Sequence, residues 1–308
     1  MSRIYEALQR AEMERKAAQA AGGELTAEPM DGPGIEEPPA AGDVLALGNV
    51  ARHPWKLSIP SFPALAERGA VIEQFRSLRS RVQQARYEAP LKTILISSGM
   101  PSEGKTFVAA NLAMSLARNS VNRILLIDGD LRRPTIHSLL GAPNSPGLSE
   151  YLAGTAEWNG IMQRDRGPKI VESATARSIS NLTFIPAGIC GDNSSELAAN
   201  HRIEILVATL SRYFDWILID SPPVLAVTDA VELARAADAV LLVARAAKTP
   251  FDVAQRAQAA FGNSRILGFV LNDVKDAPRG GSYNNNYYYG GEDAGGGASR
   301  GKDMRRKG

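Results

Sequence analysis

Short runs of isoleucine, leucine and valine recur along the chain and indicate the strands of a sheet. Nearly every position in most of these runs is apolar, which is typical of parallel strands whose two faces are both covered. The runs cover residues 92–97, 123–127, 182–186, 216–219, 239–243 and 266–271. Helical patterns fill most of the gaps between the runs, at residues 105–118, 194–212, 228–236 and 250–261. This alternation predicts an α/β fold with a doubly wound, mostly parallel sheet.

The rest of the chain divides into segments of different composition. Residues 1–20 are good helix formers with a thin apolar stripe, which fits either a helix that docks on a partner or a frayed surface helix. Residues 21–60 are rich in glycine, proline, alanine and acidic residues over most of their length, and we expect a disordered linker. An ordered domain is expected over residues 61–278, with a first helix at 63–88. Glycine, asparagine and tyrosine dominate much of residues 279–308, here called the tail, which we expect to be disordered.

The composition excludes several classes of protein. The 308 residues are 44% hydrophobic and 22% charged, and the net charge of +2 gives no case for nucleic-acid binding. The lone cysteine, Cys190, cannot form an internal disulfide and fits a reducing compartment. No apolar run approaches the roughly 18 to 20 residues of a membrane helix, and the first residues lack a signal-peptide pattern. We therefore expect a cytoplasmic protein that reaches the inner membrane only through a partner.

One segment carries a phosphate-binding motif in the context that this motif requires. The sequence SSGMPSEGKT at residues 97–106 contains G-x-x-x-x-G-K-[ST], directly after a predicted strand and at the start of a predicted helix. Backbone N–H groups at such a helix start form a nest for anions. Lys105 is expected to reach the β- and γ-phosphates of ATP, and the Thr106 hydroxyl to bind Mg²⁺. The residues of this loop that are predicted to bind ATP are Gly99, Met100, Pro101, Ser102, Glu103, Gly104, Lys105 and Thr106.

Two other predicted strands end in aspartate. The segment ILLIDGD contains Asp128 and Asp130, and the segment ILIDSPP contains Asp220. Because ligands of open α/β sheets bind beyond the carboxyl ends of the strands, we expect these carboxylates to face the phosphate-binding loop. Asp220 fits the role of holding Mg²⁺ directly or through water, and the other two fit metal binding and nucleophile activation. The alternative for either strand end taken alone is that its carboxylates are solvated turn residues.

These motifs together resemble a known family. The loop SSGMPSEGKT, the segment ILLIDGDLRRPTIH and the strand end ILIDSPP are similar to the Walker A, A′ and B motifs of the bacterial tyrosine kinases of capsule and exopolysaccharide synthesis. The sequence EQFRSLR at residues 73–79 resembles the E-x-x-R-x-x-R element of that family. The sequence YNNNYYY at residues 283–289 resembles its terminal tyrosine cluster. The likeness extends over residues 65–289.

The resemblance implies a P-loop fold related to the partitioning and septum-site ATPases, and an enzyme that transfers phosphate from Mg·ATP to tyrosine. It implies catalytic roles for Lys105, Asp128 and Asp130. The implied metal ligands are Thr106, Asp128 and Asp220, and the implied adenine-reading residue is Asn272. The implied phosphoacceptors are Tyr283, Tyr287, Tyr288 and Tyr289, and the implied contacts of a homo-oligomer are Glu73, Arg76 and Arg79. The implied partners are protein tyrosine substrates and a membrane-anchored protein that controls polysaccharide chain length and activates the kinase.

Two other functions are compatible with the same motifs. A partitioning-type ATPase would act as a positional switch that hydrolyses ATP without phosphorylating protein. Residues 99–102 lack the signature lysine of that class, and this difference, together with the tyrosines of the tail, favours the kinase. A non-catalytic scaffold of a polysaccharide export complex would use every motif for ATP binding alone.

Overall fold

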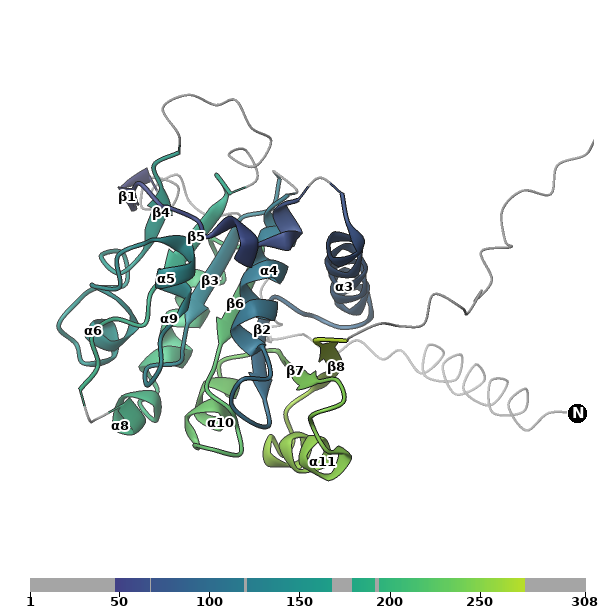
Figure 1. The fold of residues 1–308 in the computed structure, drawn as a ribbon. Helices are drawn as coiled ribbons and strands as arrows, with labels where there is room; N and C mark the ends of the chain where they lie inside the picture. Colours follow the sequence, from purple (N-terminus) through teal and green to yellow (C-terminus); the bar gives the residue numbers. More distant parts are fainter. Residues whose placement is uncertain (1–47, 67, 119–120, 168–178, 192–193, 275–308) are drawn as a thin grey trace, which may run out of the picture. The chain divides into compact units, whose positions relative to one another are not determined.

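A mostly parallel sheet organises the chain. The structure, a computed structural model, describes residues 48–66, 68–118, 121–167, 179–191 and 194–274. Strands of these residues form one sheet in the order β1-β4-β5-β3-β6-β2-β7-β8 (Figure 1). Their bounds are β1 Ala51–His53, β2 Thr93–Ser98, β3 Ile124–Asp128, β4 Gln163–Asp165, β5 Leu182–Ile185, β6 Trp216–Asp220, β7 Ala239–Arg245 and β8 Ile266–Asn272. Neighbouring strands are parallel except β4 and β5, which are antiparallel. The predicted doubly wound, mostly parallel sheet is confirmed.

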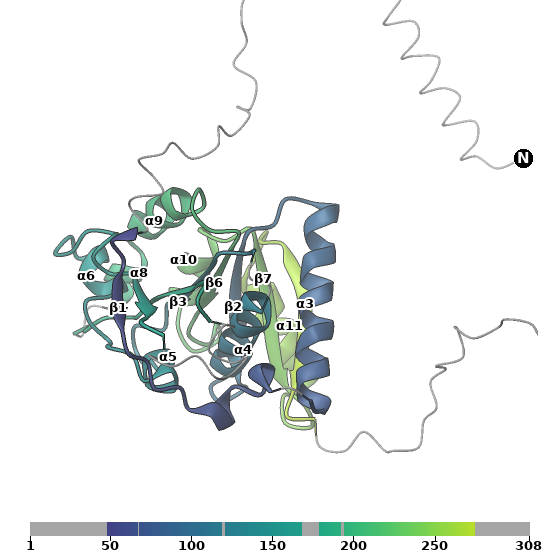
Figure 2. The ribbon, with the colours of Figure 1, turned by 90° about the horizontal axis from the view of Figure 1, so that it is seen from above.

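Helices cover both faces of the sheet (Figure 2). Buried side chains of α3, α4 and α5 belong to one apolar cluster, and those of α6, α9, α10 and α11 belong to the other. The helix bounds are α3 Ala70–Glu88, α4 Lys105–Ala117, α5 Ile136–Leu140, α6 Leu148–Leu152, α8 Ser194–Ala198, α9 Arg202–Leu210, α10 Asp229–Ala234 and α11 Phe251–Ala260, with 3-10 turns at Ile59–Ser61 and Pro63–Leu65. Successive residues of a strand alternate between the two clusters, which explains why the central strands are apolar at every position.

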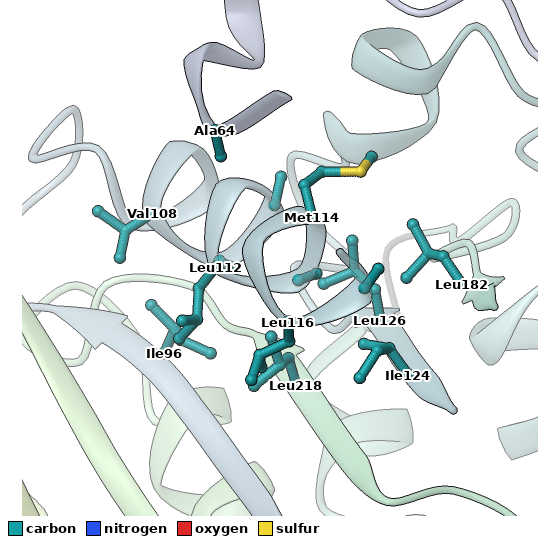
Figure 3. Packing of buried hydrophobic residues seen from close by; sticks show 14 of the residues in the cluster. Ala64, Ile96, Val108, Leu112, Met114, Leu116, Ile124, Leu126, Leu182 and Leu218 are labelled. Atoms are coloured by element: carbon teal, nitrogen blue, oxygen red, sulfur yellow. The ribbon is translucent and has the colours of Figure 1, made fainter. Parts of the chain in front are cut away.

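Helix α4 lies at the centre of one of these layers. Every residue from Val108 to Ala117 is buried, as expected for a helix that is apolar on all sides. Leu112 and Leu116 point toward the sheet, where they lie near Ile96 of β2 and Leu218 of β6 (Figure 3). This packing fixes the first turn of α4 at the carboxyl ends of β2 and β6, where the functional site is built.

The prediction of a disordered linker over residues 21–60 is wrong for the part that the structure describes. Strand β1 pairs with β4, and the backbone N–H of Trp55 donates to the Asp165 carboxylate at 3.1 Å. The Trp55 ring is buried edge-on against Phe184, with ring centroids 6.2 Å apart. Composition predicted disorder because large apolar residues are few here, but one buried tryptophan contributes a large contact area.

Two predicted helices are interrupted. The helix expected at 63–88 is a 3-10 turn and then α3, which begins after Gly69 at a φ of 140°. The helix expected at 194–212 is two helices, α8 and α9, because the side-chain oxygen of Asn200 accepts the backbone N–H of Arg202 at 3.1 Å. The strands β1 and β4 and the helices α5 and α6 were not predicted, since three to five residues are too few to show a period.

Several predicted segments lie outside the described residues. They are the N-terminal helix at 1–20, residues 21–47 of the linker, residues 275–278 of the domain, and the tail with its four tyrosines. Within the described part of the chain, no helix is long and apolar enough to cross a bilayer.

Candidate active site

The phosphate loop, residues 99–104, connects the end of β2 to the first residue of α4. Its backbone is left-handed at Ser102, with a φ of 65°, and at Gly104, with a φ of 95°. The positive φ of Gly104 favours glycine, and a Cβ atom there would also meet the side-chain amide of Asn272. The loop therefore presents its amides at the start of a 13-residue helix, where backbone N–H groups and the helix dipole favour an anion.

The first two residues of α4 meet the acidic strand ends. The Lys105 ammonium nitrogen lies 2.9 Å from Asp130 Oδ2 and 3.9 Å from Asp220 Oδ2. The Thr106 hydroxyl donates to Asp220 Oδ2 at 2.6 Å. Burial opposes the positive charge on Lys105, but Asp220 and Asp130 outweigh it and raise the lysine pKa above its usual value. The structure thus brings together four of the predicted site residues: Lys105, Thr106, Asp130 and Asp220.

The two acidic strand ends are in register. Asp128 of β3 stands opposite Asp220 of β6, so the two side chains leave the same edge of the sheet. The backbone N–H of Gly129 donates to the Asp220 carbonyl oxygen at 2.8 Å. A Cβ atom on Gly129 would lie 2.6 Å from that oxygen, and this close approach requires glycine.

Asp128 is bound by the backbone that follows it. Its Oδ2 atom accepts N–H groups of Thr135 and Ile136, each at 3.1 Å, at the start of α5. Its Oδ1 atom accepts the Asp130 N–H at the longer distance of 3.3 Å. Burial, and then the charge of Asp220, raise the pKa of Asp128 to about 8 despite these bonds. Asp128 is inaccessible to solvent, and its raised pKa favours the protonated carboxyl.

Asp220 has different surroundings. It is also fully buried, and burial raises its pKa to about 6, although Lys105 and the Thr106 hydroxyl act in the opposite direction. Its Oδ1 atom is buried with no hydrogen-bond partner within the described residues. A buried carboxylate oxygen without a partner is costly unless a ligand completes it.

These residues fit a magnesium ion that is shared with a nucleotide. In the described ranges, no three or more histidine, cysteine, aspartate or glutamate side chains are arranged to hold a metal. Magnesium at nucleotide sites commonly takes one or two protein ligands and completes its shell with phosphate oxygens and water. The Thr106 hydroxyl and the free Asp220 oxygen match that donor set, whereas the oxygens of Asp128 already accept backbone N–H groups.

A second group of side chains holds the phosphate loop from the side of β7 and β8. The side-chain amide of Asn272, at the end of β8, donates to the Glu103 carbonyl at 3.0 Å. The Thr249 hydroxyl, in the loop after β7, donates to the Glu103 carboxylate. Sequence reasoning missed Thr249. Its position just after a parallel strand, at the edge where ligands bind, is the signal that could have found it.

The predicted oligomer contacts lie on α3. Glu73 and Arg76 form an exposed ion pair at 2.6 Å. The Arg79 guanidinium instead donates to the Ser115 carbonyl of α4 at 2.7 Å, so this residue joins two helices of the same chain. Among the predicted oligomer contacts, Glu73 and Arg76 are the more exposed side chains.

Comparison with known proteins places this site in a family. Residues 91–252 match the AAA domain family. The chain is 37% identical over 205 residues to tyrosine-protein kinase wzc of Salmonella typhimurium. This match covers 66% of this chain and 27% of that protein. It is 31% identical over 205 residues to tyrosine-protein kinase YwqD of Bacillus subtilis. This match covers 66% of this chain and 81% of that protein. The chain belongs to the tyrosine-protein kinase family of bacteria.

Solved structures of the tyrosine-protein kinase family share the fold. The kinase domain of Escherichia coli tyrosine kinase ETK is 32% identical, with a TM-score of 0.57 over 68% of this chain and 80% of that chain. The chimerical protein CapA2B2 is 26% identical, with a TM-score of 0.63 over 76% of this chain and 99% of that chain. The resemblance predicted from the three motifs is thus confirmed, and the P-loop family implies nucleotide binding. The matched region makes up about a quarter of tyrosine-protein kinase wzc.

Proposed function

We propose that this chain is a protein-tyrosine kinase that transfers the γ-phosphoryl group of ATP to tyrosines of its own tail. The observation that carries the proposal is the meeting of Lys105, Thr106, Asp130 and Asp220 at the phosphate loop, in a chain of the tyrosine-protein kinase family. A phosphoryl-transfer site acts through positioning and charge, and this cluster supplies both.

Each residue of the cluster has a role that its contacts support. Amides of the phosphate loop bind the β-phosphate, and Lys105 leaves Asp130 to contact the β- and γ-phosphates. Thr106 and Asp220 hold Mg²⁺. Magnesium, when bound, supplies neutralisation of the charge that develops on the transferred phosphoryl group.

We propose Asp130, rather than Asp128, as the acceptor of the tyrosine proton. Asp128 is fully buried, its oxygens accept three backbone N–H groups, and its pKa is raised. Asp130 is also buried, with 4% of its surface exposed, but its side chain lies against Lys105 at the phosphate loop. The Asp130 carboxylate pairs with the Lys105 ammonium and becomes free when that ammonium turns to phosphate. The tyrosine oxygen then forms the new bond to phosphorus, its proton passes to Asp130, and ADP leaves with the electrons of the broken phosphate bond.

The regulatory part of the proposal rests on the family resemblance. We propose that subunits assemble through α3, where Glu73 and Arg76 are exposed, and that the tail of one subunit enters the site of another. A membrane-anchored partner of polysaccharide synthesis would hold the oligomer at the inner membrane and activate it. Each phosphate adds a charge of about −1.5 to −2, so a phosphorylated tail would be repelled by the acidic site and the oligomer would loosen.

Phosphotyrosine mapping after incubation with labelled ATP tests the proposal. Among the described tyrosines, Tyr87 is 91% exposed, whereas Tyr151 and Tyr213 are buried, with exposed fractions of 6% and 7%. Phosphate is expected at Tyr283, Tyr287, Tyr288 and Tyr289, and the Tyr87→Phe variant serves as the matched control that keeps full incorporation. Incorporation confined to Tyr87, or none in the presence of an activating partner, would refute self-phosphorylation of the tail.

A mixing experiment tests transfer between subunits. A Lys105→Met chain with an intact tail is combined with an active chain that lacks residues 279–308. Phosphotyrosine on the Lys105→Met chain is expected, because only its partner can carry out transfer. A mixture that stays unlabelled, while the full-length chain labels itself, would show transfer within one chain.

A further inference from the structure

The phosphate loop contains a carboxylate that the proposed chemistry does not use. Glu103 lies one residue before Gly104 and is buried, with 4% of its surface exposed. A negative charge beside a phosphate-binding nest is unfavourable unless the carboxylate has a structural task, and burying a charge without partners is costly. Both oxygens of Glu103 do have partners, which indicates such a task.

One oxygen of Glu103 shapes the loop itself. Its Oε2 atom accepts the backbone N–H of Met100 at 2.7 Å, which closes the turn over residues 100–103. Within this turn Ser102 has a φ of 65°, a left-handed conformation that is strained for a residue other than glycine. Strain of this kind persists where surrounding bonds enforce it, and the bond to Met100 spans the strained residue.

The other oxygen ties the phosphate loop to a distant part of the chain. Glu103 Oε1 accepts the Thr249 hydroxyl, and the Thr249 oxygen in turn accepts the backbone N–H of Arg245 at 2.8 Å. Thr249 lies in the loop between β7 and α11, 146 residues away in sequence. The Asn272 amide adds a bond to the Glu103 carbonyl at 3.0 Å. The strained turn is thus anchored to the ends of β7 and β8.

We infer that Glu103 and Thr249 are a pair of positioning residues that hold the phosphate loop in its nucleotide-binding shape before the nucleotide arrives. The two side chains bind each other and not the phosphates, and they take no part in transfer. Its effect is on affinity, because a loop that is already ordered loses less conformational entropy when it binds. The inference rests on nucleotide binding by the phosphate loop, which is part of the proposed function.

Calorimetric titration of the full-length chain with Mg·ADP tests the pair. The Thr249→Val variant removes the hydroxyl at nearly constant volume, and we expect binding about tenfold weaker, the effect of losing one hydrogen bond to a charged group. The Thr249→Ser variant keeps the hydroxyl and should bind within about twofold of wild type. Thr209→Val is the matched control and should leave affinity unchanged, since among the described residues the Thr209 hydroxyl donates to the Ile205 carbonyl of its own helix, α9.

A double-mutant cycle tests whether Glu103 and Thr249 act together or contribute independently to nucleotide affinity. Glu103→Ala should weaken Mg·ADP binding at least as much as Thr249→Val does, and Thr249→Val added to Glu103→Ala should cause no further loss. In phosphotransfer assays the KM for ATP should rise with Thr249→Val while kcat stays within about twofold, the signature of lost binding. Melting temperatures of the Val and Ser variants are measured alongside.

Three results would overturn the inference. They are wild-type affinity in Thr249→Val, losses that multiply in the double variant, and equal losses of affinity in the Val and Ser variants that follow their melting temperatures. Failure of the proposed kinase activity gives a different result. In that case the wild-type chain binds Mg·ADP and transfers no phosphate, and the titrations still decide whether Glu103 and Thr249 act as a pair.

Discussion

The ends of β3 and β6 have similar sequences but different surroundings. Each is an apolar strand that stops at an aspartate, and Asp128 and Asp220 stand opposite each other in the sheet. Asp128 uses its oxygens on three backbone N–H groups and so builds the turn into α5. Asp220 receives one hydroxyl and keeps one buried oxygen without a partner within the described residues. We propose that the first aspartate serves the fold and that the second is available to a ligand.

The largest expected effect comes from the Lys105 side chain, whose ammonium group lies near the acidic strand ends. Lys105→Met removes the charge aimed at the transferred phosphoryl group, and phosphotransfer should fall by about a thousandfold or more. The measurement is the initial rate of phosphotyrosine formation at saturating ATP. Lys248→Met is the control, because Lys248 is exposed in the neighbouring loop after β7 and should keep near-normal activity. Comparable rates for the two variants would remove Lys105 from the catalytic site.

The next largest effect is a loss of catalytic rate on substitution of Asp220, at the end of β6. Asp220→Ala removes the carboxylate that we assign to magnesium, and we expect a loss of about a hundredfold or more in kcat. Its unfolding free energy should change less than that of Asp128→Ala, because the variant removes a buried, unpaired oxygen together with the Thr106 hydroxyl bond and the 3.9 Å ion pair with Lys105. Rate measurements across a magnesium titration check the assignment. Activity that is insensitive to the substitution at every magnesium concentration would refute it.

The matched substitution at the β3 end should act on stability. Asp128→Ala leaves the N–H groups of Thr135 and Ile136 without their acceptor, and we expect a loss of about 2–4 kcal/mol in unfolding free energy. Urea denaturation of the nucleotide-free chain measures it beside Asp220→Ala. If Asp220→Ala proves the less stable of the two, the comparison between the strand ends is wrong.

The last expected effect is a pH dependence. The pKa values of Asp128 and Asp220 are raised to about 8 and about 6, against about 3.9 in an unfolded chain. Between those limits the folded state holds more protons than the unfolded state, so these groups make the unfolding free energy fall as pH rises from about 4 to about 8. Asp128→Asn should remove most of this slope while keeping an acceptor for the α5 amides. Urea denaturation at several pH values tests the direction, and an unchanged slope in the variant would assign the effect to other groups.

The sequence by itself determined the central part of this protein. The strands β2, β3 and β6 could be predicted because a strand that is covered on both faces must be apolar throughout, and that pattern is local. The phosphate loop could be predicted because Gly104, Lys105 and Thr106 have chemical roles that depend on their spacing alone. From these elements it followed that the carboxylates of the strand ends should face the loop, and the structure places them there.

The tertiary structure alone decided the rest. Strands β1 and β4 exist because they pair with each other and because Trp55 is buried against Phe184, and three residues carry no pattern that reveals such contacts. The different surroundings of Asp128 and Asp220 depend on which backbone amides come within reach, although both residues follow similar strands. Thr249 reaches Glu103 across 146 residues of sequence. Local sequence predicts what a segment can form, but burial and long-range hydrogen bonds arise from packing between segments, so only the folded chain shows them.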